Sequence, residues 1–256
     1  MASRAEAVAA SAGGATAVEA AGPSLRRAIR EALGDLYYHS WRLVPGNVLW
    51  SFTALAVLLA VVVSPLGLAA LPVLAIPTAG LFRMTTRVAR GGSVSFWDAM
   101  SAWRTELGGT LTLGAGLAVA AVVLGTNIVT GLTSGTPLGW ALATLAVWGL
   151  VAAWLFAWTA WPIVTDPWRA GWPFRERVRL ASVLLLAHPI RIAALGVALA
   201  LFLGISTVAF VALLMVSVAV AALVAARYIL PAADRLDRQI GMARERGLPE
   251  AVSEPG

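Results

Sequence analysis

The polar side chains that fall inside long apolar stretches are the residues of this chain best placed to do chemistry. Asn127 is the one carboxamide plainly inside such a stretch. It can hydrogen-bond a sugar hydroxyl or a neighbouring helix, and polar residues in membrane helices more often join helices. Asn47 and Ser51 stand at the start of the first apolar stretch, and Thr78 lies in the second. These residue types predict either an intramembrane binding site for a neutral molecule or hydrogen bonds between helices.

Two prolines, Pro72 and Pro77, lie in the second apolar stretch. Each removes a backbone hydrogen bond and clashes with the preceding helical turn. In hydrocarbon the freed carbonyl groups need partners, so such a span is covered by protein or lines a cavity. The pattern predicts a broken helix that contributes to a substrate or partner site together with Asn47, Ser51 and Thr78. A kinked helix of purely structural importance is the alternative.

Residues typical of enzymes are scarce. His39 and His188 are the only histidines, neither has metal-ligand spacing, and the absence of cysteine excludes thiolate chemistry. The chain has no phosphate-binding loop and no nucleophile elbow. No ionisable residue falls inside a predicted span, which argues against a proton-driven pump. We therefore predict a protein that is not an enzyme and has no cofactor or metal.

Trp154, Trp158 and Trp161 follow helical spacing near the end of the fourth apolar stretch. Aromatic rings at this spacing can stack on sugar faces. Tryptophan is also enriched where a helix meets the membrane surface. The sequence favours interfacial anchoring and packing for these three residues.

The composition is that of a membrane protein. The chain of 256 residues is 59% hydrophobic and 12% charged, with a mean hydropathy of +0.82, whereas about a quarter of the residues of soluble domains are charged. All 19 basic residues are arginine, and together with the 13 acidic residues they give a net charge of +6. Because these arginines flank the apolar stretches, they indicate attraction to anionic lipid headgroups rather than to nucleic acid.

Three pairs of apolar stretches are long enough to cross a bilayer. With three hairpins, all 19 basic and all 13 acidic residues fall on one side of the membrane. Since basic residues stay in the cytoplasm, the pattern predicts a polytopic inner-membrane protein with both termini inside. The fold class we expect is an all-α, polytopic transmembrane bundle of about six spans: 47–63, 66–82, 108–131, 138–164, 192–205 and 207–226.

The last pair has no proline or charged residue between its two stretches. Residues 192–226 form one unbroken apolar stretch, in which Gly204 to Ser206 is the most plausible reversal, and whether it makes two full spans stays open. The membrane domain is expected to cover 23–230. Residues 1–22 read as a disordered tail, and 231–256 as a cytoplasmic C-terminal helix and tail.

An amphipathic segment precedes each predicted hairpin. The segments begin near Ser24, Ser95 and Phe174, and in each of them apolar residues recur at helical spacing. Ser24 is a candidate N-cap, and Ser95 with Asp98 is typical of a capping box. We expect three interfacial helices, one before each hairpin, and hence a pseudo-threefold arrangement.

Several short motifs, in order, resemble the YesL-like family of bacterial membrane proteins. They are Asn47-Val48-Leu49-Trp50, Ile76 to Leu81 followed by Arg83, Arg87, Arg90 and Gly91, the segment from Ser95 to Arg104, and His188-Pro189-Ile190-Arg191. The resemblance covers about residues 36–230, with Pro72 as a departure. It implies five or six helices and an association with carbohydrate uptake, and it implies no catalytic residues.

These observations predict an accessory or scaffolding component of a membrane assembly, such as a carbohydrate uptake system. Its partners would be the lipid bilayer and transporter subunits, with the oligomeric state left open. The expected docking residues are Trp97, Trp103, Arg104, Trp168 and Arg177. An autonomous transporter or channel for a neutral solute or lipid is the alternative, and a membrane-organising protein is a third.

Overall fold

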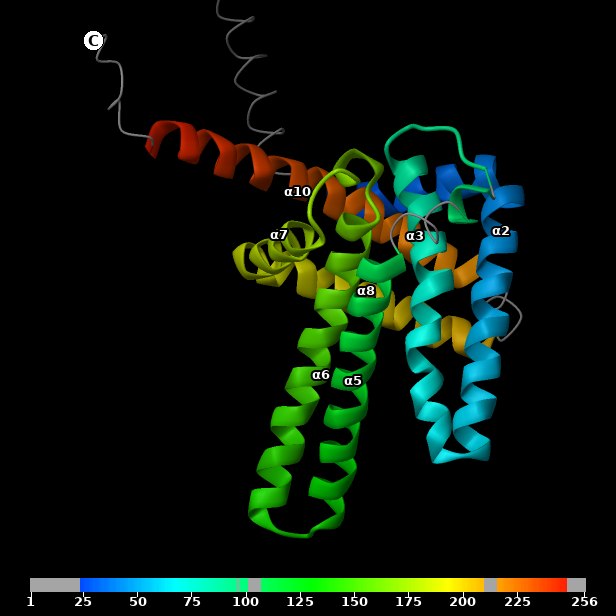
Figure 1. The fold of residues 1–256 in the computed structure, drawn as a ribbon, viewed down its shortest axis with the longest axis vertical. Coiled ribbons are helices and arrows are strands. Elements are labelled where there is room, and N and C mark those ends of the chain that lie inside the picture. The colour runs from blue at the N-terminus through cyan, green and yellow to red at the C-terminus, as the bar shows by residue number, and fades with distance from the viewer. Residues whose placement is uncertain (1–23, 96, 101–106, 210–215, 248–256) are drawn as a thin grey trace, which may run out of the picture.

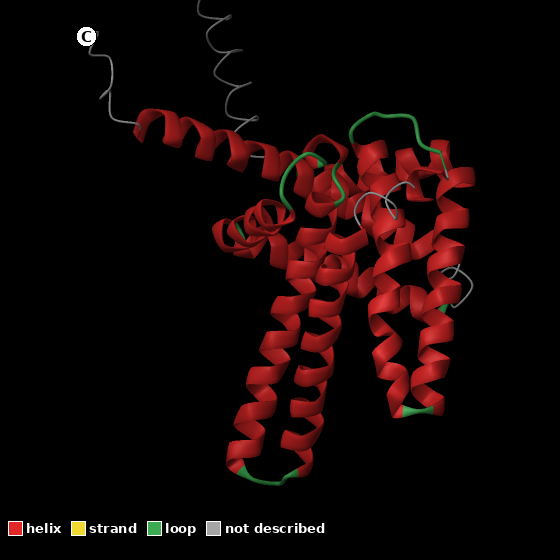
Figure 2. Ribbon diagram, in the orientation of Figure 1, coloured by secondary structure: helices red, strands yellow, loops and turns green. Residues whose placement is uncertain are grey.

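The computed structural model describes residues 24–95, 97–100, 107–209 and 216–247, and these form helices joined by short loops, without a strand (Figure 2). The helices are α2 (Leu25–Val63), α3 (Ala75–Ala89), α5 (Leu107–Thr133), α6 (Pro137–Val164), α7 (Phe174–Ala187), α8 (Pro189–Val208) and α10 (Val218–Gly247). Two 3₁₀ helices, η1 (Pro65–Leu74) and η2 (Pro167–Arg169), complete the elements. The expectation of an all-α protein is confirmed for the described residues.

Two hairpins stand side by side in the fold. Helix α2 pairs with the continuous segment η1–α3, and α5 pairs with α6, and the two reversals point in the same direction (Figure 1). In the part of the chain that is described, five helical segments are long and apolar enough to cross a membrane: these four and α8. This fits a multi-pass membrane protein in contact with the lipid bilayer.

The first amphipathic segment is not a separate helix. Ser24 is the N-cap, because its side-chain oxygen accepts a hydrogen bond from the amide of Arg27 at 3.3 Å. The helix then continues through Pro45 to Val63 for 39 residues, about 58 Å at the usual helical rise. This exceeds the roughly 30 Å of a bilayer core. The first turns of α2, in dark blue, accordingly lie across the top of the bundle (Figure 1).

The second span is broken as its prolines suggest. It begins as the ten-residue 3₁₀ helix η1, which contains Pro72, and becomes α-helical from Ala75. Runs of 3₁₀ helix beyond four residues are uncommon. Gly67 allows η1 to lie against α2, because a Cβ atom there would be 2.3 Å from the backbone of Ala60. The absence of a side chain therefore sets the packing of the first hairpin.

The predicted reversal at Gly204 to Ser206 is wrong. Helix α8 continues through these residues to Val208. A break in an apolar environment would leave backbone groups without partners, and neither glycine nor serine forces one. The predicted sixth span, 207–226, includes 210–215, which lie outside the described residues. A three-hairpin arrangement is not confirmed, since α8 and α10 run obliquely across the two upright hairpins (Figure 1).

The first half of α10 forms the centre of the protein. Ser217 and the first nine residues of α10, 218–226, are all buried, and α10 packs against α2, α3, α6, α7 and α8. Five of these ten residues are alanine, and small residues let helix backbones approach closely. The second half of α10, in red, extends beyond the bundle (Figure 1).

The other two amphipathic segments are found in part. Ser95 and Asp98 form the predicted capping box: Asp98 accepts from the amide of Ser95 at 2.8 Å, and Ser95 accepts from the amide of Trp97 at 3.3 Å. The end of this segment lies outside the described residues. The third segment corresponds to α7, which buries Leu180, Ala181 and Leu184 on one face.

Candidate functional site

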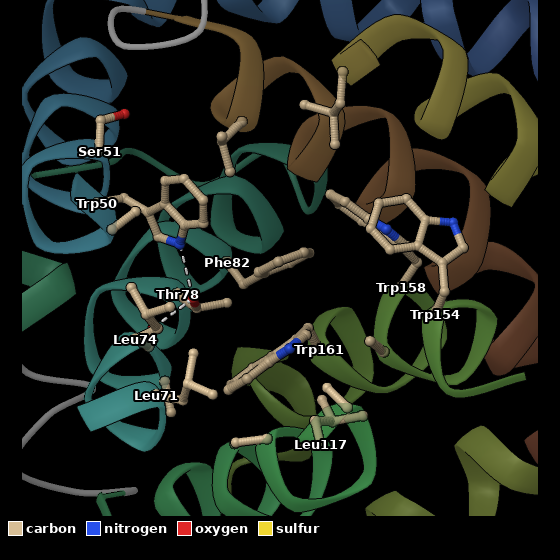
Figure 3. Close-up of a pocket in the computed structure, with 18 of the residues that line it drawn as sticks. Trp50, Ser51, Leu71, Leu74, Thr78, Phe82, Leu117, Trp154, Trp158 and Trp161 are labelled. Atoms are coloured by element: carbon tan, nitrogen blue, oxygen red, sulfur yellow. Dashed lines mark hydrogen bonds between the residues drawn. The ribbon is translucent and has the colours of Figure 1, made fainter. Parts of the chain in front are cut away.

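A cavity of about 550 Å³ lies between the two upright hairpins (Figure 3). Its walls come from α2, the η1–α3 segment, α5 and α6, with one residue each from α8 and α10. The lining is almost entirely aliphatic and aromatic. The volume falls within the range of small-molecule sites, and the surrounding helices are ones that are apolar enough to cross a membrane. The cavity is therefore suited to an apolar molecule taken from the bilayer.

One wall of the cavity is a cluster of aromatic rings. Phe82 of α3 stacks on Trp161, with 6.1 Å between ring centroids, and lies 5.8 Å from Trp158. Trp158 in turn meets Trp154 edge to face at 5.4 Å. The indole nitrogen of Trp154 donates to the carbonyl oxygen of Gly196 at 3.1 Å, which ties this wall to α8. Such ring pairs contribute about 0.5–1.5 kcal/mol each beyond their buried area, so the wall is held in a defined shape.

The opposite wall carries the few polar groups. The indole nitrogen of Trp50 donates to the hydroxyl oxygen of Thr78 at 2.8 Å, and that hydroxyl donates to the carbonyl of Leu74 at 2.6 Å (Figure 3). Thr78 thus satisfies a carbonyl at the point where η1 passes into α3. Because these groups bind each other, they offer little to a polar ligand. Ser51 also lines this wall.

Asn47 lies one helical turn before Ser51 and is fully buried. Its side-chain oxygen accepts a hydrogen bond from the backbone amide of Ala219 at 2.7 Å, and its side-chain nitrogen donates to Ser51 at 3.4 Å. The amide of Ala219 belongs to the first turn of α10, whose donors have no partner within the helix. Asn47 therefore fixes the start of α10 next to the cavity.

Small residues of α3 and α5 lie in close contact beside the cavity. A Cβ atom on Gly114 of α5 would lie 2.2 Å from the Cβ of Ala75 in α3. Both residues line the cavity, as does Ala118 one turn further along α5. The small residue Gly114 thus packs against another helix of this chain. It brings the two hairpins together on one side of the cavity.

The structure brings only some of the predicted intramembrane residues to this site. Thr78 lines the cavity and Asn47 lies beside it, whereas Pro77 is buried in α3 and Pro72 is half-buried in η1, outside the lining. Asn127 is exposed on α5 and does not line the cavity. Asn127 therefore does not share this cavity with the proline-broken span, because the helical register of α5 turns its side chain outward.

At the charged end of the bundle, two arginines and two aspartates form a largely buried network. Arg90 lies 2.6 Å from Asp166 and 2.5 Å from Asp234. Arg169 pairs with the same two carboxylates, at 2.5 Å from Asp234. The network has no net charge and joins the end of α3, the η2 segment and α10. Asp166 and Arg169 are three positions apart, but Arg90 and Asp234 are far from them in the sequence, so no local pattern indicates the whole network.

The contacts in this network favour the ionised forms of Asp234 and Arg90. Burial raises the pKa of Asp234, but hydrogen bonds and charge from Arg90 and Arg169 outweigh it and lower the pKa overall. Burial also lowers the pKa of Arg90, and the two carboxylates reverse this and raise it. The guanidinium of Arg90 lies 3.9 Å from the ring centre of Trp168, a cation–π contact. The network therefore fixes the charged end of the bundle.

The predicted docking residues do not form one surface. Trp97 and Trp168 are exposed, and Trp168 covers Arg90. Arg177 is 6% exposed and donates to the carbonyl oxygen of Val164, so its prediction as a docking contact is wrong. The buried carbonyl at the end of α6 explains this position. Trp103 and Arg104 lie outside the described residues.

No protein-family model, curated protein or solved structure matches the chain. The resemblance to the YesL-like family stays a prediction. Within the described residues, no group of three histidine, aspartate or glutamate side chains gathers that could hold a metal ion.

Proposed function

We propose that this protein is a non-enzymatic membrane protein that binds an apolar, lipid-like molecule between its two upright hairpins. The observation that carries the proposal is the cavity of about 550 Å³, walled by aromatic and aliphatic side chains inside the apolar part of the bundle. The alternative drawn from the sequence is a carrier for a neutral solute or lipid. The lining gives a sugar few hydrogen-bonding groups, so it favours an apolar solute over a sugar.

The site would sit within the bacterial inner membrane with both chain termini in the cytoplasm. The arginine-rich end of the bundle supports this orientation through the positive-inside rule. Orientation is testable by attaching a reporter to either terminus and measuring its accessibility from the periplasm.

The binding proposal is tested by filling the cavity. Ala118→Phe places a ring into the cavity from α5, and the matched control Val119→Phe adds a ring at the neighbouring residue, which is 62% exposed. Mass spectrometry of molecules that copurify with each protein should show an apolar compound in the wild type and the control. The compound should be depleted in Ala118→Phe. Equal recovery from both variants would contradict the proposal.

A second candidate function is that of an accessory or scaffolding component of a membrane assembly, including the carbohydrate uptake system that the resemblance implies. The support is the second half of α10, which extends beyond the bundle, with Trp97 and Trp168 exposed. Affinity purification from native membranes tests it. Transporter subunits should copurify with the wild type and be reduced by Trp97→Ala, and purification of the protein alone after cross-linking would contradict it.

A further inference from the structure

A second, much smaller pocket lies where α7, α8 and α10 meet. Its polar lining comprises His188, Arg191, Tyr228 and Arg235, and its floor includes Leu184 and Ile192. The volume is about 20 Å³, which is close to that needed for one water molecule. No residue lines both this pocket and the cavity between the hairpins. It is therefore a separate feature with different chemistry.

The lining of this pocket is cationic. It has two arginines and a histidine, and none of its lining residues is acidic. Arg235 also donates from its Nε to the carbonyl oxygen of Pro231 at 3.1 Å, which holds its guanidinium group against α10. Burial raises the pKa of the Tyr228 hydroxyl, and the charge of Arg191 opposes this. Arg191 is thus close enough to act on the Tyr228 hydroxyl, which stays protonated and can donate a hydrogen bond.

The helix arrangement adds to this positive charge. Helix α8 begins at Pro189, directly after His188, and runs for 20 residues. The N-terminus of a helix carries a partial positive charge, which favours anions. At this pocket the partial charge of the helix end adds to the charges of Arg191 in α8 and Arg235 in α10. The attraction for an anion therefore does not depend on the helix end alone.

The surroundings of the pocket are apolar and exposed. Leu186 and Ile190 flank His188 along the chain and are 79% and 84% exposed. Helix α8 is apolar enough to cross a membrane, and Leu186 and Ile190 lie around its first residue. If α8 spans the bilayer, this end of the helix is where acyl chains and headgroups meet. A ligand with an anionic head and apolar chains matches both parts of this surface.

We propose that this pocket binds the phosphate group of an anionic membrane lipid. Arg191 and Arg235 would neutralise the phosphate, and the Tyr228 hydroxyl would donate a hydrogen bond. The phosphate group lies at the mouth of the pocket with an oxygen directed inward, because the volume holds no more. A free phosphate ion shares this chemistry, but the exposed Leu186 and Ile190 favour a lipid. The site is independent of the cavity between the hairpins.

The test measures lipid binding to the full-length protein by native mass spectrometry, with phosphatidylglycerol and phosphatidylcholine as probes. The double variant Arg191→Gln/Arg235→Gln should weaken phosphatidylglycerol binding about tenfold or more, because each basic residue near the membrane surface contributes severalfold to affinity. Binding of phosphatidylcholine should not change. Tyr228→Phe, which removes one hydroxyl, should weaken phosphatidylglycerol binding by a smaller factor.

The matched control is Arg175→Gln/Arg179→Gln, which removes the same charge from exposed positions of α7. It should retain the binding of phosphatidylglycerol. An equal loss in both double variants would show diffuse surface attraction and overturn the proposal, as would displacement of the lipid by millimolar inorganic phosphate alone. Tyr228→Phe keeps the test valid if the double variant does not fold, because an unchanged affinity for phosphatidylglycerol in that variant would also contradict the site.

Discussion

The side-chain oxygen of Asn47 lies 2.7 Å from the backbone nitrogen of Ala219, although 172 positions separate the two residues. This hydrogen bond joins the first span to the first turn of the central helix α10. Both residues are fully buried, so no water can replace the bond. A single carboxamide therefore determines where the last described helix begins relative to the first.

Replacing Asn47 with alanine should destabilise the protein by about 1–3 kcal/mol, because a buried backbone amide loses its acceptor. The measurement is thermal or denaturant unfolding in a mild detergent. Asn127→Ala is the matched control, since Asn127 is the same residue type but exposed on α5, and it should change the stability little. If the two variants were equally stable, the hydrogen bond from Ala219 would not hold the helix.

The buried network of Arg90, Asp166, Arg169 and Asp234 gives a second prediction. Asp166 is fully buried and contacts both arginines. Asp166→Asn leaves two guanidinium groups incompletely neutralised and should cost about 3–5 kcal/mol. Unfolding of the variant in detergent, followed by circular dichroism, measures this cost.

The control for Asp166→Asn is Glu31→Gln. Glu31 forms an ion pair with Arg27 at 2.7 Å on the surface of α2, and pairs of this kind contribute about 0.3–0.5 kcal/mol. We expect a much smaller effect there. Comparable losses from the two variants would mean that solvent reaches the network and screens it.

The sequence predicts the helical spans well where its signals are local. Apolar length gave α5 and α6 within a few residues, and the prolines indicated the break that η1 makes in the second span. Caps at Ser24 and Ser95 were also visible, because a cap depends on residues three positions apart. These features need no knowledge of the tertiary structure.

Other features have no local signal. The course of α8 through Gly204 could not be foreseen, since glycine permits a turn without requiring one. Arg90 and Asp234 lie 144 positions apart, and nothing near either residue indicates its partner. The spacing of Trp158 and Trp161 suits a membrane interface and a cavity wall equally. Only the packing of α3 against α6 decides between them.

Gly67 gives a prediction about packing. A Cβ atom there would lie 2.3 Å from the backbone of Ala60, so Gly67→Ala should force η1 away from α2 at a cost of about 1–3 kcal/mol. Gly125→Ala is the control, because a Cβ at Gly125 meets nothing within 4 Å. That change should leave the stability equal or raise it by up to about 1 kcal/mol. A stable Gly67→Ala variant would show that the first hairpin is loosely packed.

The acid dependence of stability follows from Asp234, whose folded-state pKa is lowered from its ordinary value of 3.8 by Arg90 and Arg169 despite its burial. When the pH falls through that ordinary value, the unfolded chain takes up a proton at Asp234 while the folded protein does not. The stabilisation is therefore complete above about pH 5 and is lost as the pH falls through the lowered folded-state pKa. Unfolding measured from pH 6 downward should show this decline. In Asp234→Asn the stability should be lower at pH 6 and should fall less steeply with acid, because the linked proton is gone. The same slope in both proteins would mean that another group carries the acid sensitivity.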